Sequence, residues 1–270
     1  MGWILLAHGF TLLRRGEWPG EYTDRVEDDA YRALAAREGA HWFHRGRRAL
    51  VEHVLGEPQP VDGRRVLEIG SGTGGNVDLL AGFGELTLIE PNAMARSLTT
   101  SRRVDAVDLR AGYWPGQEIL GPGEVFHLIA LFDVLEHLDD DVGALRAVRA
   151  HLAPDARVII TVPAYSWMWS PHDERLHHRR RYRKSSLVEA IAAADLQVRY
   201  CSYFNTVLFP FAMAARLLTR LTSSSDSPGH DVPSERLNSL MLRAMLLERH
   251  VIPRRSLPYG LSLMAIATDG

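Results

Sequence analysis

The chain has almost no cysteine and almost no lysine. Its single cysteine, Cys201, excludes an internal disulfide framework and a thiolate-rich metal site. A reducing compartment fits this composition, so we predict a cytoplasmic protein. Only one lysine, Lys184, stands among the 31 Lys and Arg residues. Any chemistry that requires a lysine amine must therefore use Lys184.

Long hydrophobic runs and a strong net charge are also missing. The two most apolar stretches, 3–13 and 207–218, are shorter than the roughly 20 residues that a membrane-spanning helix needs. Pro210 and Arg216 also interrupt the second stretch, so we predict no membrane span. The formal net charge of -2 gives no electrostatic reason to expect a nucleic acid as partner.

What the sequence does contain is an alternation of short apolar runs with helical segments. The chain has 270 residues, of which 46% are hydrophobic, and this is enough to bury a core. Alternation of buried strands with helices is typical of an α/β protein with a doubly wound, mostly parallel sheet. The runs predict strands at 65–70, 85–90, 104–110, 125–133, 157–163, 196–204 and 261–268.

The pattern of predicted helices and strands divides the chain into four segments. We predict an N-terminal helical cover at 1–60 and a Rossmann-like core at 61–205. A helical lid is expected as an insertion at 206–256, and a final strand of the core sheet, running antiparallel, at 257–270.

A glycine-rich turn joins the first predicted strand to a helix in the segment RVLEIGSGTGGN, residues 65–76. Glycines permit positive φ angles and let a ligand approach the backbone closely. Gly70, Gly72 and Gly75 fit a dinucleotide fingerprint, and Glu90 lies 20 residues beyond Gly70, where a ribose-binding acid is expected. By itself the loop leaves dinucleotides and other adenosine cofactors open.

Three observations favour S-adenosylmethionine. Glu68 lies two residues before the first glycine, where a carboxylate would repel a pyrophosphate but attract the amino group of an amino-acid cofactor. The Tyr-x-x-x-Lys pair of short-chain dehydrogenases is excluded, because Lys184 is the only lysine and position 180 is Arg. An antiparallel last strand after an insertion would also be unusual for a dinucleotide fold. Other nicotinamide-dependent oxidoreductases remain an alternative.

The chain resembles the class I S-adenosylmethionine-dependent methyltransferases from about Trp42 to Ala267. The matching segments, in the family's order and spacing, are VLEIGSGTG, LIEPN, LFDVLEHLDDD, VIITVPAY and WSPHDERLHHRRRY. The last of them is similar to a subgroup of small bacterial enzymes that act on small molecules or lipid-like compounds. The resemblance implies a Rossmann-like sheet of seven strands and S-adenosylmethionine as the methyl donor.

The resemblance also implies where the cofactor binds. The glycine loop would hold its methionine part, Glu90 would accept the ribose hydroxyls, and the two following residues would flank the sugar and adenine. Near the adenine, the family's acidic or small polar residue is replaced by an aromatic pair, which predicts stacking. The candidate cofactor-binding residues are Glu68, Gly70, Ser71, Gly72, Gly74, Glu90, Pro91, Asn92, Tyr113, Trp114 and Asp133.

Three histidines and an aspartate are the candidate catalytic groups. His137 follows the strand at 125–133, and His172, Asp173 and His177 follow the strand at 157–163. Both sets are expected at the carboxyl edge of the sheet, where open sheets bind ligands. An imidazole titrates near neutral pH, so either His172, oriented by Asp173, or His177 is predicted as a base, with an ion-paired structural role as the alternative. We expect no metal, because no cysteine is nearby and the carboxylates lack a recognised ligand spacing.

Aromatic and basic residues are predicted to surround the acceptor. The aromatic residues either wall an apolar pocket or pack in the core, and the arginines of the run 179–184 either bind an anionic group or stay solvated. The candidate substrate residues are Tyr22, Trp42, Arg48, Tyr165, Trp167, Trp169, Arg181 and Tyr182.

The sequence therefore predicts a methyltransferase that transfers a methyl group from S-adenosylmethionine to an oxygen, nitrogen or carbon of a small, partly apolar metabolite. Lipid-like and anionic acceptors are both open. The alternatives are an NAD(P)-dependent oxidoreductase and a non-catalytic, cofactor-binding partner subunit. We expect a monomer or a homodimer.

Overall fold

A computed structural model of the chain describes residues 20–58, 63–101, 107–116, 119–214 and 232–270. The side chains of residues 20–27 and of His172 lie outside this description. The apolar stretch 3–13 and the end of the stretch 207–218 also fall outside it. Of the helices that are described, none is long and apolar enough to cross a membrane.

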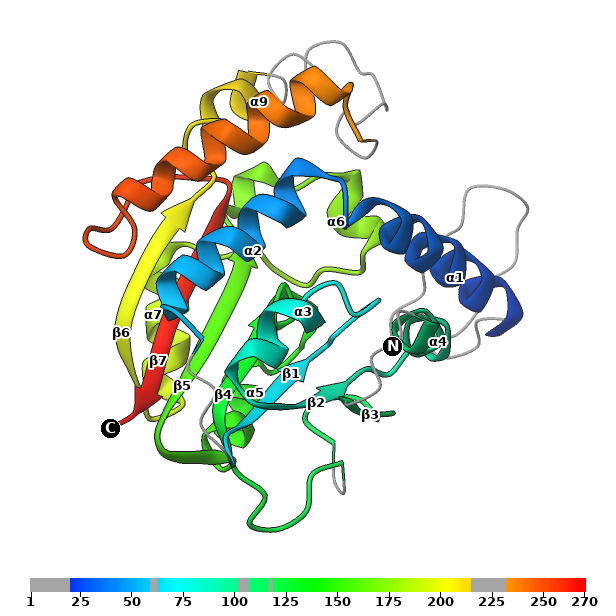
Figure 1. Cartoon of the computed structure of the whole chain (residues 1–270), viewed down its shortest axis with the longest axis vertical. Coiled ribbons are helices and arrows are strands. Elements are labelled where there is room, and N and C mark those ends of the chain that lie inside the picture. Colours follow the sequence, from blue (N-terminus) through cyan, green and yellow to red (C-terminus); the bar gives the residue numbers. More distant parts are fainter. Residues whose placement is uncertain (1–19, 59–62, 102–106, 117–118, 215–231) are drawn as a thin grey trace, which may run out of the picture.

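Seven strands form one sheet in the order β3-β2-β1-β4-β5-β7-β6 (Figure 1). The first five strands along the chain pair in parallel, whereas β7 is antiparallel to both of its neighbours, β5 and β6. The predicted fold, including the antiparallel last strand, is confirmed. The strands are β1 (Arg65–Ile69), β2 (Glu85–Ile89), β3 (Val107–Arg110), β4 (Phe126–Phe132), β5 (Leu152–Pro163), β6 (Leu196–Phe204) and β7 (Ser262–Asp269).

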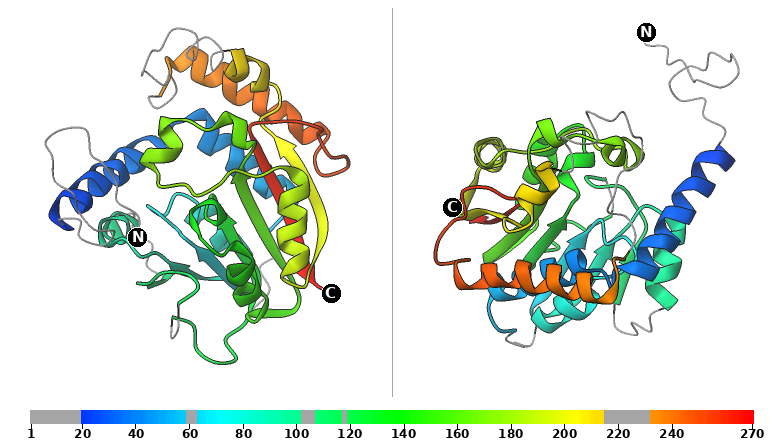
Figure 2. Two further views of the ribbon diagram at one scale, coloured as in Figure 1. Left: turned by 180° about the vertical axis from the view of Figure 1, so that it is seen from behind. Right: turned by 90° about the horizontal axis from the view of Figure 1, so that it is seen from above.

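Helices cover both faces of the sheet. Figure 1 shows α2 and α3 in front of the strands, and the view from behind in Figure 2 shows α5 and α7 on the opposite face. The described α-helices are α1 (Gly20–Arg37), α2 (Trp42–Leu55), α3 (Val77–Leu80), α4 (Ala93–Ser101), α5 (Asp141–Arg149), α6 (Pro171–Arg175), α7 (Lys184–Ala193) and α9 (Glu235–Leu246).

The buried side chains form two apolar clusters, one on each face of the sheet. Successive residues of a strand point to opposite faces, so neighbours such as Val66 and Leu67 of β1 belong to different clusters. Leu128 and Ile129 of β4 divide in the same way. Both faces are covered by helices, which is why the strands read as continuous apolar runs in the sequence.

The insertion between β6 and β7 is joined to the N-terminal helices. The backbone N–H of Trp42 donates to Asn238 Oδ1 of α9 at 2.9 Å, and Asn238 Nδ2 donates to the carbonyl of Ala40 at 3.0 Å. Gly46 faces Met245, with no room between them for a larger side chain. The helices α2 and α9 therefore pack closely although they are far apart in the sequence (Figure 1).

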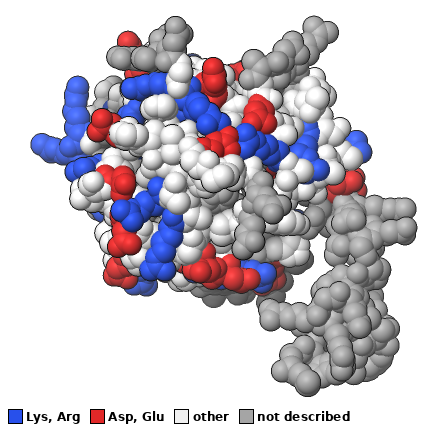
Figure 3. All heavy atoms as spheres, turned by 90° about the horizontal axis from the view of Figure 1, so that it is seen from below, with Lys and Arg blue, Asp and Glu red and all other residues white. Residues whose placement is uncertain are grey.

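The surface seen from below carries charges of both signs. In Figure 3 Lys and Arg side chains are interspersed with Asp and Glu rather than gathered by sign. Charges also pair within the loops and strands: Arg110, for example, binds Asp108 at 2.6 Å and Glu124 at 2.8 Å.

Candidate active site

The glycine loop begins where β1 ends. Gly70, Gly72 and Gly74 all have positive φ angles, of 70°, 56° and 77°, a region that favours residues without a Cβ atom. At Gly70 an added Cβ would also lie only 2.7 Å from Cγ2 of Val134. The turn therefore requires glycine for its conformation, and at Gly70 also for the close approach of the loop that follows β4.

Glu90, the residue after β2, is hydrogen-bonded to the glycine loop. Its buried carboxylate accepts the N–H of Gly72 at 2.8 Å and the N–H of Asn92 at 2.9 Å, one through each oxygen. Burial raises the pKa of Glu90, although these two amide donors oppose that effect. The structure thus brings together three residues predicted to bind the cofactor: Gly72, Glu90 and Asn92.

Glu68 of β1 is a buried acid whose hydrogen bonding is incomplete. Its side chain is 1% exposed, and Oε1 accepts a hydrogen bond from Asn76 Nδ2 at 2.7 Å. Among the described residues nothing donates to Oε2, nor does the buried hydroxyl of Ser71 have a partner. Burial raises the pKa of Glu68 to about 8. Both orphaned atoms are polar, so the loop is arranged to receive a polar ligand.

Arg47 of α2 reaches the same edge and was not predicted from the sequence. Its guanidinium pairs with Asp133, the residue after β4, and lies 5.5 Å from the centre of the Phe132 ring. Asp133 also accepts the hydroxyl of Thr161 at 3.1 Å. The signal that could have identified Arg47 is helical spacing, because it lies between Gly46 and Leu50 on the buried face of α2. The predicted Arg48 instead donates to the backbone carbonyl of Glu38 at 2.9 Å.

Glu38 is a second site residue that sequence reasoning missed. This buried acid follows α1, and its Oε1 accepts the hydroxyl of Thr73 in the glycine loop at 2.6 Å. Its carboxylate lies so close to Gly75 that a Cβ atom there would collide with it. No motif marks Glu38, because the contact exists only once the N-terminal helices dock on the loop.

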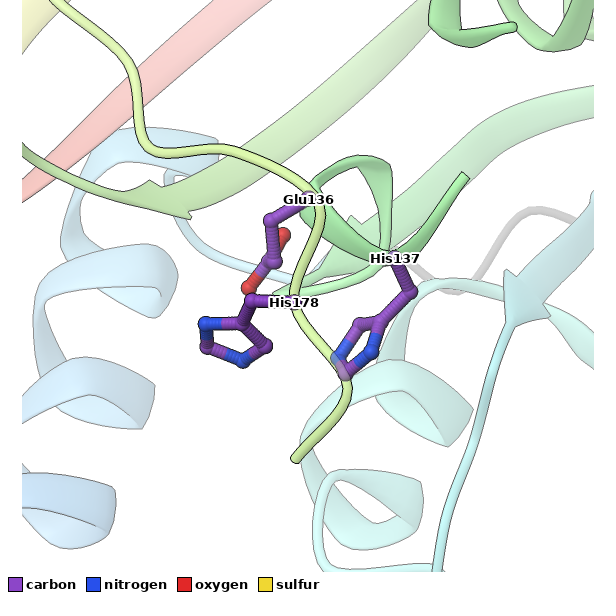
Figure 4. A group of neighbouring side chains, drawn as sticks. All are labelled: Glu136, His137 and His178. Carbon is purple, nitrogen blue, oxygen red and sulfur yellow. The ribbon is translucent and has the colours of Figure 1, made fainter. Parts of the chain in front are cut away.

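Two histidines and a glutamate meet in the loops after β4 and β5. Glu136 and His137 belong to a short 3-10 turn, Leu135–His137, and Figure 4 shows them beside His178. The rings of His137 and His178 are nearly perpendicular, with centroids 4.7 Å apart. Glu136 is fully buried, and burial raises its pKa well above the usual value. Of these three residues His137 was predicted as a catalytic group.

Asp173 binds two side chains of its own loop. It was expected to orient His172, whose side chain lies outside the described part of the chain; among the described residues it binds His178 Nδ1, at 2.9 Å. Arg181, expected to meet substrate, makes a two-pronged pair with this buried carboxylate at 2.6 and 2.9 Å. Burial opposes the ionisation of Asp173, but its hydrogen bonds from His178 and Arg181 hold its pKa well below the usual range. The predicted His177 is exposed, with a positive φ of 55°.

Three other predicted residues are used by the fold itself. The hydroxyl of Tyr182 donates to Asp141 at 2.7 Å, and the indole N–H of Trp114 donates to the carbonyl of Ala144 at 3.1 Å. Both side chains are buried in the cluster beneath α5, and Trp42 is buried in the cluster beneath α2.

Tyr113, by contrast, is 79% exposed, so of the predicted stacking pair only Tyr113 is accessible to a ligand. The predicted Tyr22 lies in α1, but its side chain is outside the described part.

An aromatic cluster lies at the ends of β5 and β6. Tyr165 stacks on Tyr203 with ring centroids 5.2 Å apart, and Trp167 and Phe209 lie 5.5 and 5.6 Å from Tyr165. Trp167 remains 41% exposed. The structure therefore unites the predicted Tyr165 and Trp167 and adds two rings, Tyr203 and Phe209, that were not predicted as site residues. The predicted Trp169 is half-buried at the end of the same turn.

Comparison with known proteins identifies the class of this site. The family model for a methyltransferase domain matches residues 40–205, which is more than half of the chain. The chain therefore belongs to the methyltransferase domain family. This assignment confirms the predicted class, an S-adenosylmethionine-dependent methyltransferase, and decides against a nicotinamide-dependent oxidoreductase. None of the curated proteins compared with the chain matches it.

Solved methyltransferase structures share the fold at low sequence identity. An S-adenosylmethionine-dependent methyltransferase from Thermotoga maritima is 14% identical, with a TM-score of 0.53 over 93% of this chain and 99% of that one. Geranyl diphosphate methyltransferase in complex with S-adenosylmethionine is 14% identical, with a TM-score of 0.53 over 95% and 93% of the two chains. The complex of DhpI with S-adenosylhomocysteine gives 16% identity and a TM-score of 0.51 over 92% and 97%.

Proposed function

We propose that the protein methylates an oxygen, nitrogen or carbon atom of a small, partly apolar metabolite, and that the loops after β1 and β2 hold the cofactor. The observation that carries the second part is the buried Glu68 Oε2, to which no other described residue donates. The residues proposed to hold the cofactor are Glu68, Gly70, Ser71, Gly72, Gly74, Glu90, Pro91 and Asn92.

The orphaned atoms beside the glycine loop fit the amino-acid end of S-adenosylmethionine. A buried carboxylate without a full set of partners is costly, and an ammonium group would both pair with its charge and donate to Oε2. The hydroxyl of Ser71 can hydrogen-bond the carboxylate of the same ligand. A pyrophosphate at this place would be repelled by Glu68.

Glu90 is suited to bind two neighbouring hydroxyls. Each of its oxygens already accepts one backbone N–H, which fixes the orientation of the carboxylate, and each has a further lone pair. A ribose diol can donate to both oxygens at once. Tyr113, which is exposed after β3, is the one residue of the predicted aromatic pair that can stack on an adenine.

The chemistry requires alignment more than acid or base strength. S-adenosylmethionine supplies a methyl group on a sulfonium, and transfer is an in-line displacement at that carbon. The protein then has to orient the acceptor and exclude water, and aromatic faces can stabilise the positive charge. His137, at the same edge, is the described candidate for accepting a proton from a hydroxyl acceptor.

The aromatic cluster after β5 and β6 is proposed as the wall of the acceptor pocket. The cluster belongs to the carboxyl edge on which the glycine loop also lies, because β1, β4, β5 and β6 all run in the same direction. Its rings give the site its apolar character. Arg181 is paired with Asp173, so we no longer assign it to an anionic acceptor.

We also propose that segment 206–256 is the lid of the site and that segment 1–60 is its cover.

Calorimetry with S-adenosylmethionine, S-adenosylhomocysteine and NAD tests the proposed cofactor residues. Glu90→Ala should weaken binding of the first two by about 1–3 kcal/mol, because charge-assisted hydrogen bonds to the ribose are lost. The matched control is Glu85→Ala, which removes an exposed acid from the first residue of β2 and should change nothing. Unchanged affinity in Glu90→Ala would contradict the placement of the ribose.

A further inference from the structure

Glu136, His137 and His178 lie beside one another in the loops that follow β4 and β5 (Figure 4). One carboxylate oxygen and one nitrogen from each ring all lie within 4.8 Å of one another. The residues come from two loops, after β4 and after β5, so the sheet and not a local sequence motif brings them together. Val134, two residues before Glu136, is the residue against which Gly70 packs.

Glu136 is the member of this cluster whose carboxylate receives no hydrogen bond from any other described residue. The side chain is 0% exposed, and no other described residue donates a hydrogen bond to either of its oxygens. Its carboxyl group has been removed from water, which is costly for any polar group and more so for a charged one. The charges of Arg47 and Arg181 favour its ionised form, but neither guanidinium donates a hydrogen bond to it. A cation between the three side chains would satisfy it.

His178 is held as metal-binding histidines usually are. Its Nδ1 is 2.9 Å from Asp173 Oδ1, so the ring can donate to a carboxylate at that nitrogen and ligate through Nε2. Asp173 is itself fixed by both prongs of Arg181 and by the N–H and hydroxyl of Ser170. A carboxylate anchored in this way sets the tautomer and the orientation of the imidazole.

The spacing of the three groups suits a small ion after modest side-chain rotation. Metal–ligand bonds of about 2.0–2.2 Å place donor atoms roughly 3–3.5 Å apart, so ion binding would draw the present donors together. His137 is exposed, so the site faces outward at this residue. Three protein ligands with an open side are typical of catalytic rather than structural metal sites.

We propose that Glu136, His137 and His178 form a binding site for a divalent transition-metal ion of the Zn²⁺ or Mn²⁺ type, with Asp173 as a positioning residue. Two imidazoles favour such an ion over Mg²⁺ or Ca²⁺, which prefer oxygen ligands. The role of the ion rests on the proposed methyl transfer: at its outward side it binds an oxygen of the acceptor and lowers the pKa of a hydroxyl there, whose proton passes to water. With the ion bound, His137 is a ligand and takes no part as a base.

The test is metal binding to the full chain without an affinity tag, measured by calorimetry after removal of bound ions with a chelator. Zn²⁺ or Mn²⁺ should bind in one equivalent, and Co²⁺ should give the absorption bands of a nitrogen- and oxygen-ligated ion. His178→Gln and Glu136→Gln should each lose about tenfold or more in affinity. His53→Gln, which changes an exposed histidine of α2, is the matched control and should bind as the wild type does.

Affinity for S-adenosylhomocysteine, measured on the same samples, separates this proposal from the proposed function. A wild-type protein that binds S-adenosylhomocysteine but no transition ion overturns the metal site alone. Binding of only Mg²⁺ or Ca²⁺, or equal metal affinity in His178→Gln, also overturns it. If Glu136→Gln fails to fold, as judged by loss of S-adenosylhomocysteine binding, His137→Gln at an exposed position provides the same test with little risk to the core.

Discussion

Buried acids gather at the carboxyl ends of the central strands, and each must be matched by a partner or remain protonated. Glu90 is matched by two backbone amides, whereas Glu68 is matched on one oxygen only and Glu136 on neither by any other described residue. Burial raises the pKa of all three. A site built to bind a cationic group is most stable when that group is present, which is the usual trade between stability and function.

Glu68 should make the stability of the free protein decrease as the pH rises. Its pKa is about 8 in the folded state and near the ordinary 4.5 in the unfolded chain. Between these values the unfolded chain loses the proton while the folded protein keeps it, so rising pH favours unfolding by up to about 1.4 kcal/mol per pH unit. Glu68→Gln cannot ionise and should lack this contribution to the slope.

Urea unfolding of both proteins at about pH 5.5 and about pH 7.5 measures that difference. Glu85→Gln, at an exposed position of β2, is the control and should keep the wild-type slope. Parallel slopes in wild type and Glu68→Gln would show that the folded protein ionises Glu68 as readily as the unfolded chain does.

The residues found from the sequence and those missed differ in how far their partners lie along the chain. Glu68 and the glycines form one short motif, and Glu90 follows the next strand, so pattern and spacing sufficed to predict that they lie together. Arg47 and Glu38 act on loops that only the folded sheet brings near them. The contact of Asp173 with His178 was not predicted, because His172 is its sequence neighbour and only a turn returns His178 to it.

At the scale of helices and strands, burial explains what could be predicted. Strands covered on both faces are apolar throughout, so their runs are visible in the sequence. The start of β5 was predicted five residues too late, at 157 instead of 152, because Pro154 and Asp155 interrupt the apolar run. The pairing of α2 with α9 was not foreseeable. It depends on the hydrogen bond between Trp42 and Asn238, which are 196 positions apart in the sequence. It also depends on Gly46, where any larger side chain would collide with Met245.

Asn238→Ala should loosen the contact between α2 and α9. The change leaves the buried N–H of Trp42 without its acceptor. A buried donor that makes no hydrogen bond lowers the free energy of unfolding by about 1–3 kcal/mol. Arg236→Ala, at an exposed position of the same helix, should stay within about 0.5 kcal/mol of the wild type. Denaturant unfolding compares the two, and equal stabilities would mean that water replaces the lost acceptor.

At the scale of the whole molecule, the strand order distributes three proposed sites along one edge. Loops after β1 and β2 form the proposed cofactor site, loops after β4 and β5 form the proposed metal site, and the rings after β5 and β6 form the acceptor wall. Arg47 and Asp133 lie between the first two groups and join α2 to the end of β4. The cover helices are thus tied to the edge where ligands of open sheets bind.

Because the proposed cofactor and metal sites use different residues, ligand-induced stabilisation should separate them. S-adenosylhomocysteine at about 100 times its Kd should raise the unfolding free energy by about 2.7 kcal/mol, as required for a ligand that binds only the folded state. The same gain is expected in His178→Gln, while Glu90→Ala at the same ligand concentration should gain clearly less because its Kd is higher. Thermal unfolding with and without ligand measures all three, with NAD as the ligand control that should shift none. Loss of the gain in His178→Gln would show that the two loops act as one site, since sites without shared partners contribute independently.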